Sequence, residues 1–445
     1  MSIYKALQDK ISSDPDYVVA ECIKLLDVNP DDVGALFMLG YIYTTAERFG
    51  LAIAIFRRVV DLTPKKPDCW NNLGIAYHGL KSTKAMDCFK KAWGLKQTAF
   101  YAANIASAHL EQCEWDKARE WAARAISMDS ELAGAHVTHG MTSLALNDWR
   151  NGWAGFNRSL GGKFRKELQF KEEGRWDGSP GKDLVIYGEQ GLGDEILYAS
   201  CVGDAAAISK STMLECDPRL EGLFRRSFPG VCVYGTRRKE APWIDNHEID
   251  ARAAIAALPG FFRNSTEDFK QTPWLTADPE RRLQWRALFD SWGKKPKIGI
   301  AWSGGSRHNR PDARKIGLEA FRPLIKAIDA DYVSLQYKDP TAEIEATGLP
   351  VKHYKRACET DDYDDTAALV AELDIVIGVH TSVHHLAGGL GTKSIILVPS
   401  KTLWLYANQF PWYDAKLFKQ HDAEPWSRTI QRLIKDINDS DIRRF

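Results

Sequence analysis

A buried strand, a glycine turn and a helix start follow one another in Asp183-Leu-Val-Ile-Tyr-Gly-Glu-Gln-Gly-Leu-Gly-Asp-Glu-Ile-Leu197. The continuous apolar run over residues 184–187 is typical of a parallel strand that is buried on both faces. The glycines that follow are Gly188, Gly191 and Gly193. Glycines let a backbone approach a ligand closely, and Asp194 then opens an apolar-periodic helical segment. Backbone N–H groups at a helix start attract anions, so the segment predicts a ligand site at a strand end of an α/β sheet.

Two other kinds of glycine loop do not fit this segment. A P-loop needs Gly-Lys-Ser/Thr after its last glycine, whereas Asp194 and Glu195 follow Gly193. The dinucleotide fingerprint is Gly-x-Gly-x-x-Gly, and the glycines here have the reverse spacing, with no acidic strand-end residue at the expected distance. The spacing therefore disfavours a nicotinamide enzyme. A tight strand-to-helix turn, with glycines for steric reasons only, is the structural alternative.

Composition indicates an ordinary globular protein of two or three domains. The 445 residues are 44% hydrophobic and 27% charged, and 59 basic residues balance 59 acidic ones. This balance gives no overall basic field for a nucleic acid or an anionic membrane. No apolar run reaches the roughly 20 residues of a membrane span, and the N-terminal residues lack the apolar core of a signal peptide. We therefore expect a cytoplasmic protein. The eight cysteines are scattered and include no Cys-x-x-Cys pair, so reduced, mostly buried thiols explain them better than disulfides or zinc.

The first third of the chain is repetitive. Small residues recur at a period near 34 residues, at Gly40, Gly74, Ala106 and Gly140. The surrounding patterns, Leu39-Gly40-x-x-Tyr43 and Trp70-x-x-Leu73-Gly74-x-x-Tyr77, resemble tetratricopeptide repeats. Four such helical hairpins would stack into an all-α right-handed solenoid over residues 1–165, with small residues where the two helices of a hairpin cross. Such an array either holds a peptide or protein on its concave surface or serves as a packing or oligomerisation module.

The rest of the chain predicts two α/β lobes, at residues 166–292 and 293–445. Expected strands are 183–187, 212–216 and 231–235 in the first lobe, and 297–302, 331–336, 374–379 and 394–399 in the second. Expected helices of the second lobe are 318–328, 365–373 and 382–390. Right-handed crossovers would make both sheets parallel. Ligands bind at the carboxyl ends of such strands, where the second lobe has polar loops. These loops are Ser303-Gly-Gly-Ser-Arg-His-Asn-Arg310, Tyr337-Lys-Asp-Pro and His380-Thr-Ser-Val-His-His385, and the last one's hydroxyl-rich helix start suits a phosphate or diphosphate.

Six motifs of the α/β region stand out: Trp176-Asp-Gly-Ser-Pro, Gly188-Glu-Gln-Gly-Leu-Gly-Asp194, Ile298-Gly-Ile-Ala-Trp-Ser-Gly304, Ser334-Leu-Gln336, Asp365-Thr-Ala-Ala-Leu-Val370 and Thr381-Ser-Val-His-His-Leu-Ala387. Together they resemble the bacterial tetratricopeptide proteins that carry a glycosyltransferase family 9 domain. That family includes the ADP-heptose:lipopolysaccharide heptosyltransferases. The resemblance covers about 170–430. It implies an α/β GT-B fold of two Rossmann-like lobes with parallel sheets, a nucleotide-diphosphate sugar held mainly by the second lobe, an acceptor approaching the first, and no required metal or other cofactor.

The resemblance also implies roles for individual residues. Asp194 holds the place of the proposed catalytic base, and Arg314 is the nearest match to a basic residue that contacts the nucleotide or diphosphate. The family's Asp-Thr-Gly helix start reads His380-Thr381-Ser382 here, so an imidazole replaces an aspartate. The expected acceptor-loop residues are Glu189, Gln190, Gly191 and Gly193. The expected nucleotide-sugar-binding residues are Ser303, Gly304, Arg314, Gln336, Lys338, His380, Thr381, Ser382 and His384.

Three histidines at the start of this helix raise the question of a metal. His380 and His384 have the spacing of two ligands on one helix face, yet the glutamate of the His-Glu-x-x-His zinc motif is absent. We expect no metal here, with His380 or His384 contacting phosphate and His385 buried and hydrogen-bonded.

The sequence thus predicts an inverting glycosyltransferase that moves a sugar from a nucleotide-diphosphate sugar to a hydroxyl of a protein or glycan recruited by the repeats. One alternative is a scaffold that keeps the fold without turnover, which the histidine at position 380 favours. A second is transfer to a nucleic-acid base or small metabolite, which the zero net charge and the repeat array oppose. A homo-oligomer is left open.

Overall fold

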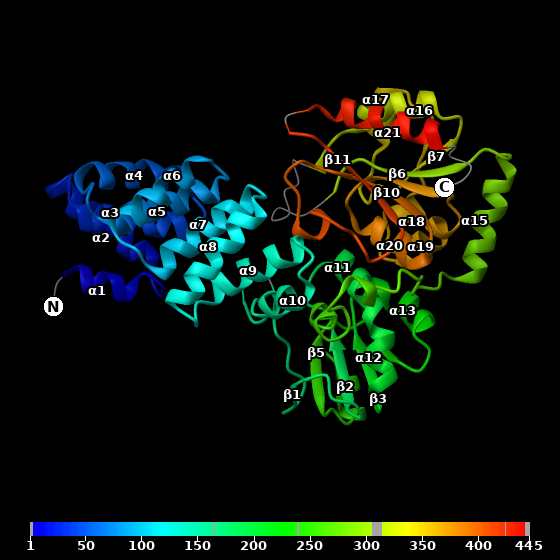
Figure 1. Ribbon diagram of the computed structural model, residues 1–445, viewed down its shortest axis with the longest axis horizontal. Coiled ribbons are helices and arrows are strands. Elements are labelled where there is room, and N and C mark those ends of the chain that lie inside the picture. Colours follow the sequence, from blue (N-terminus) through cyan, green and yellow to red (C-terminus); the bar gives the residue numbers. More distant parts are fainter. Residues whose placement is uncertain (1–2, 163–164, 238–239, 305–313, 423, 441–445) are drawn as a thin grey trace. The chain divides into compact units, whose positions relative to one another are not determined.

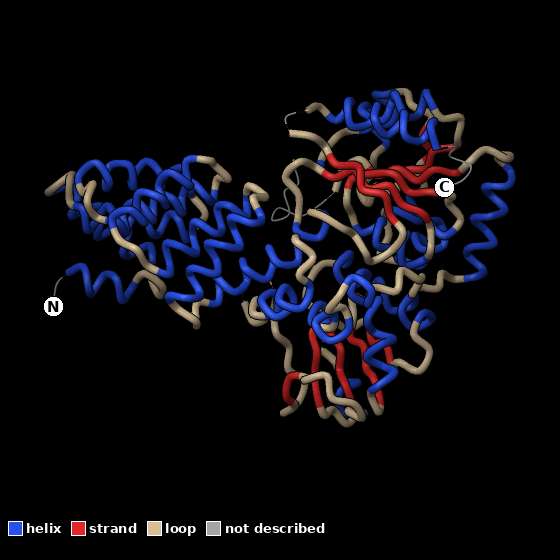
Figure 2. The backbone as a smooth tube through the Cα atoms, viewed as in Figure 1, coloured by secondary structure: helices blue, strands red, loops and turns tan. Residues whose placement is uncertain are grey.

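The structure is a computed structural model that describes residues 3–162, 165–237, 240–304, 314–422 and 424–440. The chain divides into two compact units, residues 1–146 and 147–445 (Figure 1). The first is helical throughout, and the second carries two sheets, as Figure 2 shows. No helix in these described ranges is long and apolar enough to cross a membrane.

The first unit is a stack of helical hairpins. Its helices are α1 (Ile3–Lys10), α2 (Pro15–Val28), α3 (Val33–Thr45), α4 (Phe49–Leu62), α5 (Pro67–Gly79), α6 (Lys84–Leu95), α7 (Ala99–Glu111), α8 (Trp115–Met128) and α9 (Ala133–Ala145). Side chains cap several of them: Asp32 accepts the Ala35 N–H at 2.9 Å, and Thr98 accepts the Tyr101 N–H at 3.2 Å. The predicted all-α solenoid is confirmed for this unit.

Glycines mark the close crossings inside the hairpins. A Cβ atom at Gly40 would lie 2.7 Å from the Phe56 ring, and one at Gly74 would lie 2.5 Å from the Phe89 ring. Both phenylalanines are fully buried, so the rings fill the space that a larger residue at the crossing would need. The 34-residue spacing of small residues therefore reflects the helix crossing that the sequence predicted.

The turns inside the hairpins share one backbone conformation. Glu47, Lys81 and Cys113 have φ angles of 57°, 55° and 59°, although none of them is glycine. Such values are uncommon outside glycine, and here they recur at the α3–α4, α5–α6 and α7–α8 turns. The repeat is thus visible in the backbone as well as in the packing.

The second unit begins with α10 (Trp149–Asn157), which the sequence predicted as part of the repeat array. Its Trp153 donates to the Arg263 carbonyl at 2.8 Å and packs edge-on against Tyr198, Trp404 and Trp412. These large apolar contacts explain why this helix belongs to the α/β unit although its sequence continues the repeat pattern.

The first sheet has five parallel strands in the order β1-β5-β2-β3-β4. They are β1 (Gly174–Arg175), β2 (Asp183–Tyr187), β3 (Ser211–Glu215), β4 (Cys232–Tyr234) and β5 (Ala251–Ala254). The helices between them are α11 (Leu192–Tyr198), α12 (Val202–Ile208) and α13 (Glu221–Ser227), and α14 (Pro259–Phe262) follows β5. Strand β2 is buried along its whole length, as its unbroken apolar run predicted.

The second sheet has six parallel strands in the order β11-β10-β9-β6-β7-β8. They are β6 (Lys297–Ala301), β7 (Asp331–Ser334), β8 (Val351–Lys352), β9 (Ile375–Val379), β10 (Lys393–Val398) and β11 (Ala415–Lys419). Helices α16 (Arg322–Ala327), α17 (Thr341–Thr347) and α21 (Trp426–Ser440) cover one face, and α18 (Lys355–Cys358), α19 (Tyr363–Ala371) and α20 (Ser382–Leu390) the other (Figure 1). The prediction of two parallel sheets is confirmed.

Helix α15 (Pro279–Ser291) connects the two sheets along the chain. The sequence assigned it to the first lobe, but it packs against α19 of the second, where the Trp285 indole donates to Asp365 Oδ1 at 2.9 Å. Arg282 also pairs with Glu372 at 2.7 Å. The helix therefore packs on the second lobe through α19.

Candidate interlobe pocket

The glycine loop closes on the first turn of α11. Gly191 is the N-cap residue, and the Asp194 carboxylate accepts its backbone N–H at 3.2 Å. Gly188 has no room for a side chain, because a Cβ atom there would clash with the Glu195 carboxylate. The spacing of glycines and carboxylates thus sets the course of the loop: one carboxylate caps the helix, and the next packs beneath the turn.

Asp194 is half-buried, and burial raises its pKa to about 6. The Gly191 hydrogen bond lowers the pKa, the negative charge of Glu189 raises it, and Arg165 and Arg237 lower it. The helix start alone predicts a lowered pKa, and that expectation is wrong because desolvation outweighs the helix dipole and the hydrogen bond. A carboxyl group that titrates near pH 6 is better matched to proton transfer at neutral pH than an ordinary aspartate.

Glu189, expected in the acceptor loop, points into the protein. Its Oε1 accepts two hydrogen bonds from Arg165, at 2.9 Å from Nη2 and 3.0 Å from Nε, and both side chains are almost fully buried. Arg165 also donates to the Phe156 carbonyl at 3.1 Å and to Ser159 Oγ at 3.2 Å. This ion pair ties the glycine loop to the end of α10.

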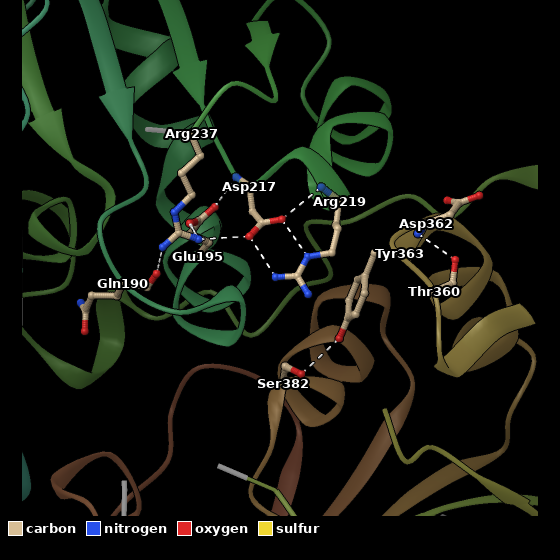
Figure 3. Close-up of polar contacts among 9 residues, drawn as sticks. All are labelled: Gln190, Glu195, Asp217, Arg219, Arg237, Thr360, Asp362, Tyr363 and Ser382. Atoms are coloured by element: carbon tan, nitrogen blue, oxygen red, sulfur yellow. Dashed lines mark hydrogen bonds and ion pairs between the residues drawn. The ribbon is translucent and has the colours of Figure 1, made fainter. Parts of the chain in front are cut away.

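A second buried ion-pair network holds the loop from the other side (Figure 3). Arg237 contacts Glu195 Oε1 at 2.6 Å and Asp217 Oδ2 at 3.2 Å, and its Nη2 donates to the Gln190 carbonyl. Glu195 also accepts the Asp217 N–H at 2.9 Å. Burial raises the pKa of Glu195 to about 8, although the charge of Arg237 opposes this. The network joins the glycine loop, α11 and the end of β3.

The two lobes meet where α11 packs against α20. A Cβ atom at Gly193 would lie 3.2 Å from Ser382 Cα, so the backbones of the two helices approach closely at this glycine. Gly193 lies in the first turn of α11, which follows β2, and Ser382 begins α20, which follows β9. Their contact brings the ends of both sheets to a common place, as expected for loops at strand ends.

A cavity of about 620 Å³ lies at this meeting point. Leu192 and Arg219 line it from the first lobe. From the second lobe it is lined by Ser303, Leu335, Tyr337, Cys358, Glu359, Thr360, Asp361, Tyr363, Thr366, Thr381, Ser382 and Val383. The volume falls in the range of small-molecule sites. We call this cavity the interlobe pocket.

Several predicted residues of the second lobe surround this pocket. Ser303, Thr381 and Ser382 line it, and Gly304 lies against the Thr381 side chain. Gln336 is buried and holds the loop after β6: with its amide oxygen turned toward that loop, it accepts the Trp302 and Ser303 N–H groups at 2.9 and 2.8 Å. Residues 305–310 of the predicted loop lie outside the described residues.

Arg314 and His380 form part of a separate buried group beside Asp194. Arg314 donates to the His380 carbonyl at 3.2 Å, and the His380 ring packs against Tyr406 at a centroid distance of 4.7 Å. Burial lowers the pKa of Arg314, and the charges of Tyr406 and Asp194 raise it. The predicted base of the first lobe and the predicted cation of the second are therefore within electrostatic reach of each other.

His384, His385 and Lys338 do not line the interlobe pocket. His384 is completely buried with Nδ1 2.6 Å from Ser394 Oγ, and burial lowers its pKa to about 4, so its side chain is turned into the lobe and not toward a phosphate. His385 is buried between Tyr406 and Tyr413, at 3.2 and 3.1 Å from their hydroxyls. Lys338 is exposed, beside the Tyr337 ring.

The sequence reasoning did not single out Arg219, Asp361 or Tyr363. Arg219 follows β3 in the short segment Pro218–Leu220, and no spacing rule links it to residues of the second lobe. The one available signal was Asp217-Pro-Arg219 directly after an apolar strand, which places polar residues at a carboxyl strand end. Among the residues that the structure describes, no group of three histidines, cysteines or acidic residues has the arrangement of a metal site.

Comparisons with known proteins match the repeats, and one relative matches most of the α/β unit as well. Residues 33–66 match the family model of the tetratricopeptide repeat. Protein FlbA of Caulobacter vibrioides is 28% identical, over 92% of this chain and 73% of its own length. The solved structure of MamA is 21% identical over 36% of this chain and 93% of MamA, with a TM-score of 0.31. YrrB, described as a TPR protein with an unusual peptide-binding site, is 18% identical over 36% of this chain and 84% of its own, with a TM-score of 0.30.

The repeat pattern, the stacked hairpins and the family match agree on the first unit. It is a tetratricopeptide-type helical solenoid, an architecture that commonly mediates protein interactions.

Proposed function

We propose that residues 147–445 form an inverting GT-B glycosyltransferase that moves a sugar from a nucleotide-diphosphate sugar to a hydroxyl of a macromolecular acceptor. The observation that carries the proposal is the interlobe pocket, which combines the hydroxyl-rich start of α20 with Leu192 and Arg219 of the opposite lobe. The sequence motifs of this part of the chain also resemble those of glycosyltransferase family 9. The repeat array would recruit a protein or glycan acceptor.

The second lobe supplies the groups that suit a diphosphate. Thr381 and Ser382 stand at the N-terminus of α20, where backbone N–H groups and the helix dipole favour negative charge. Ser303 adds a hydroxyl from the loop after β6, and Arg314 adds a fixed positive charge nearby. These groups would hold the donor and stabilise the nucleoside diphosphate as it leaves.

Asp194 would supply the base. In the proposed step its carboxylate takes the proton of the acceptor hydroxyl, and the oxygen forms a bond to the anomeric carbon of the donor sugar. The bond from that carbon to the phosphate oxygen breaks, and its electron pair leaves with the nucleoside diphosphate. Attack on the side opposite the leaving group inverts the anomeric configuration. No step calls for a metal, so a chelator should leave turnover unchanged.

Isothermal titration with ADP, GDP, UDP and CDP, with and without EDTA, tests whether the chain binds a nucleoside diphosphate without a metal. We expect at least one diphosphate to bind equally well with the chelator, and Thr381→Val combined with Arg314→Gln to weaken its binding about tenfold or more, which is about 1.4 kcal/mol. Arg314 is buried, so the melting temperature of the variant must be compared with that of the wild type. Failure of every diphosphate to bind, or binding that disappears with EDTA, contradicts the proposal.

A scaffold without turnover is the second candidate, and the histidine at position 380 favours it. His380 replaces the family's aspartate, and its ring packs against Tyr406. A chain that binds a nucleoside diphosphate but neither transfers nor hydrolyses any of its sugar conjugates would support this candidate over the enzyme.

A further inference from the structure

Arg219 carries the positive charge of the interlobe pocket. Among the described residues that line this pocket it is the one cation, and it comes from the first lobe. Glu359 and Asp361 line the same pocket with carboxylates, which would repel a phosphate. A diphosphate bound here would therefore need a cation, and the pocket wall provides one in Arg219.

The guanidinium of Arg219 is fixed in place. Its Nε donates to Asp217 Oδ1 at 2.9 Å and its Nη2 to Asp217 Oδ2 at 3.0 Å, and its backbone N–H donates to Asp217 Oδ1 at 3.1 Å. Asp217 is itself held by Arg237 at 3.2 Å. This bidentate pair already orders the arginine side chain. Ligand binding to Arg219 therefore costs little further side-chain entropy.

One edge of this guanidinium remains available. Nη1 of Arg219 donates to no described residue, and the side chain is 39% exposed. Tyr363 and Asp361 of the second lobe line the same pocket as Arg219, and Asp361 lies close enough for its negative charge to act on Arg219. The Tyr363 hydroxyl in turn donates to Ser382 Oγ at 3.2 Å, so Arg219 lies across the pocket from the start of α20 (Figure 3).

We propose that Arg219 binds the phosphate groups of the donor from the first lobe, opposite Thr381 and Ser382, with Asp217 as its positioning residue. This inference rests on the proposed function and adds a donor-binding residue on the lobe that the family resemblance assigns to the acceptor. The donor phosphates would then be contacted by both lobes, and donor binding would hold the lobes together.

Titration of the full chain with a nucleoside diphosphate, the matching monophosphate and the nucleoside tests this role. We expect Arg219→Gln to weaken diphosphate binding about tenfold or more, which is about 1.4 kcal/mol, and to leave nucleoside binding unchanged. Raising the ionic strength should weaken diphosphate binding to the wild type more than to the variant, because one charge contact is missing in the variant. The diphosphate affinity of Arg219→Lys should lie between those of the wild type and Arg219→Gln.

Arg225→Gln is the matched control, since Arg225 is an exposed residue of α13 and pairs with Glu221 one turn away. Its diphosphate affinity should equal that of the wild type. Equal affinity in Arg219→Gln, or a parallel loss of nucleoside binding, would overturn the role of Arg219 while leaving the proposed function standing. If the wild type binds none of the four diphosphates, the proposed function fails and this inference fails with it.

Discussion

The Asp194 carboxylate accepts the backbone N–H of Gly191 at 3.2 Å, so the residue proposed as the base also caps the helix that carries it. Capping and proton transfer make opposite demands, because a hydrogen bond to the carboxylate favours its ionised form. Burial decides the balance here and raises the pKa to about 6. A substitution that keeps the cap but removes the base can separate the two roles.

Asp194→Asn should keep the melting temperature and the nucleotide affinity, because asparagine has a similar shape and an amide oxygen that can still accept the Gly191 N–H. Sugar transfer should fall about 10²-fold or more, the usual contribution of a positioned general base. The wild-type rate should also decline as the pH falls through about 6, where the carboxylate takes up a proton. Asp278→Asn, which changes the N-cap of α15, should leave transfer unchanged. An Asp194→Asn chain that transfers at the wild-type rate would refute the assignment.

Glu195 should make the stability of the protein depend on pH. Burial raises its folded-state pKa to about 8 from the ordinary 4.5, so its contribution to stability is complete below pH 4.5 and is lost as the pH rises through about 8. Urea unfolding at several pH values should show wild type losing stability relative to Glu195→Gln over this range. Exposed Glu280→Gln controls for the loss of a carboxylate as such. A constant difference between wild type and Glu195→Gln would contradict the raised pKa.

Substituting one partner of the buried Arg165–Glu189 pair should strongly lower the free energy of unfolding. Arg165→Met removes both hydrogen bonds that Arg165 donates to the buried Glu189 carboxylate, and we expect a loss of about 3–5 kcal/mol in the free energy of unfolding. The double variant Arg165→Met with Glu189→Met should lose less than Arg165→Met alone. For comparison, Lys24→Gln removes an exposed pair with Glu21 and should cost far less, because solvent screens that pair. Equal losses in the buried and exposed pairs would show that the buried pair is not desolvated.

Gly74→Ala should destabilise the repeat array by about 1–3 kcal/mol, because its Cβ would lie 2.5 Å from the buried Phe89 ring. Gly94→Ala is the matched control in α6, where no atom lies within 4 Å of an added Cβ. There the substitution should stabilise the helix by up to about 1 kcal/mol. Chemical unfolding monitored by circular dichroism compares the two. The same sign of change in both variants would argue against the crossing geometry.

A fragment of residues 1–146 should fold alone as a helical solenoid, because its hairpins bury their surface against one another. Extending it to residue 163 should lower its solubility, since α10 would expose Trp149, Trp153 and Phe156, which are buried in the full chain. Circular dichroism and light scattering measure the two effects. An unfolded 1–146 fragment would mean that the array depends on the α/β unit.

The sequence by itself determined the repeats and most of the central strands, although β5, which lies between β1 and β2, was not predicted. The small residues near a 34-residue period predicted the helix crossings at Gly40 and Gly74, and apolar runs predicted β2 and β9, because helix crossings and buried parallel strands each impose a local pattern. Short edge strands such as β1 and β8 were missed, since two residues cannot display a periodicity.

Only the tertiary structure decided what depends on contacts between distant segments. It assigned α10 to the α/β unit through Trp153, and it turned His384 into the lobe against Ser394. It raised the pKa of Asp194 by burial, which no spacing of residues reveals. It also brought Arg219 to the pocket, because side chains that follow strands in two different sheets become neighbours only when the lobes pack together.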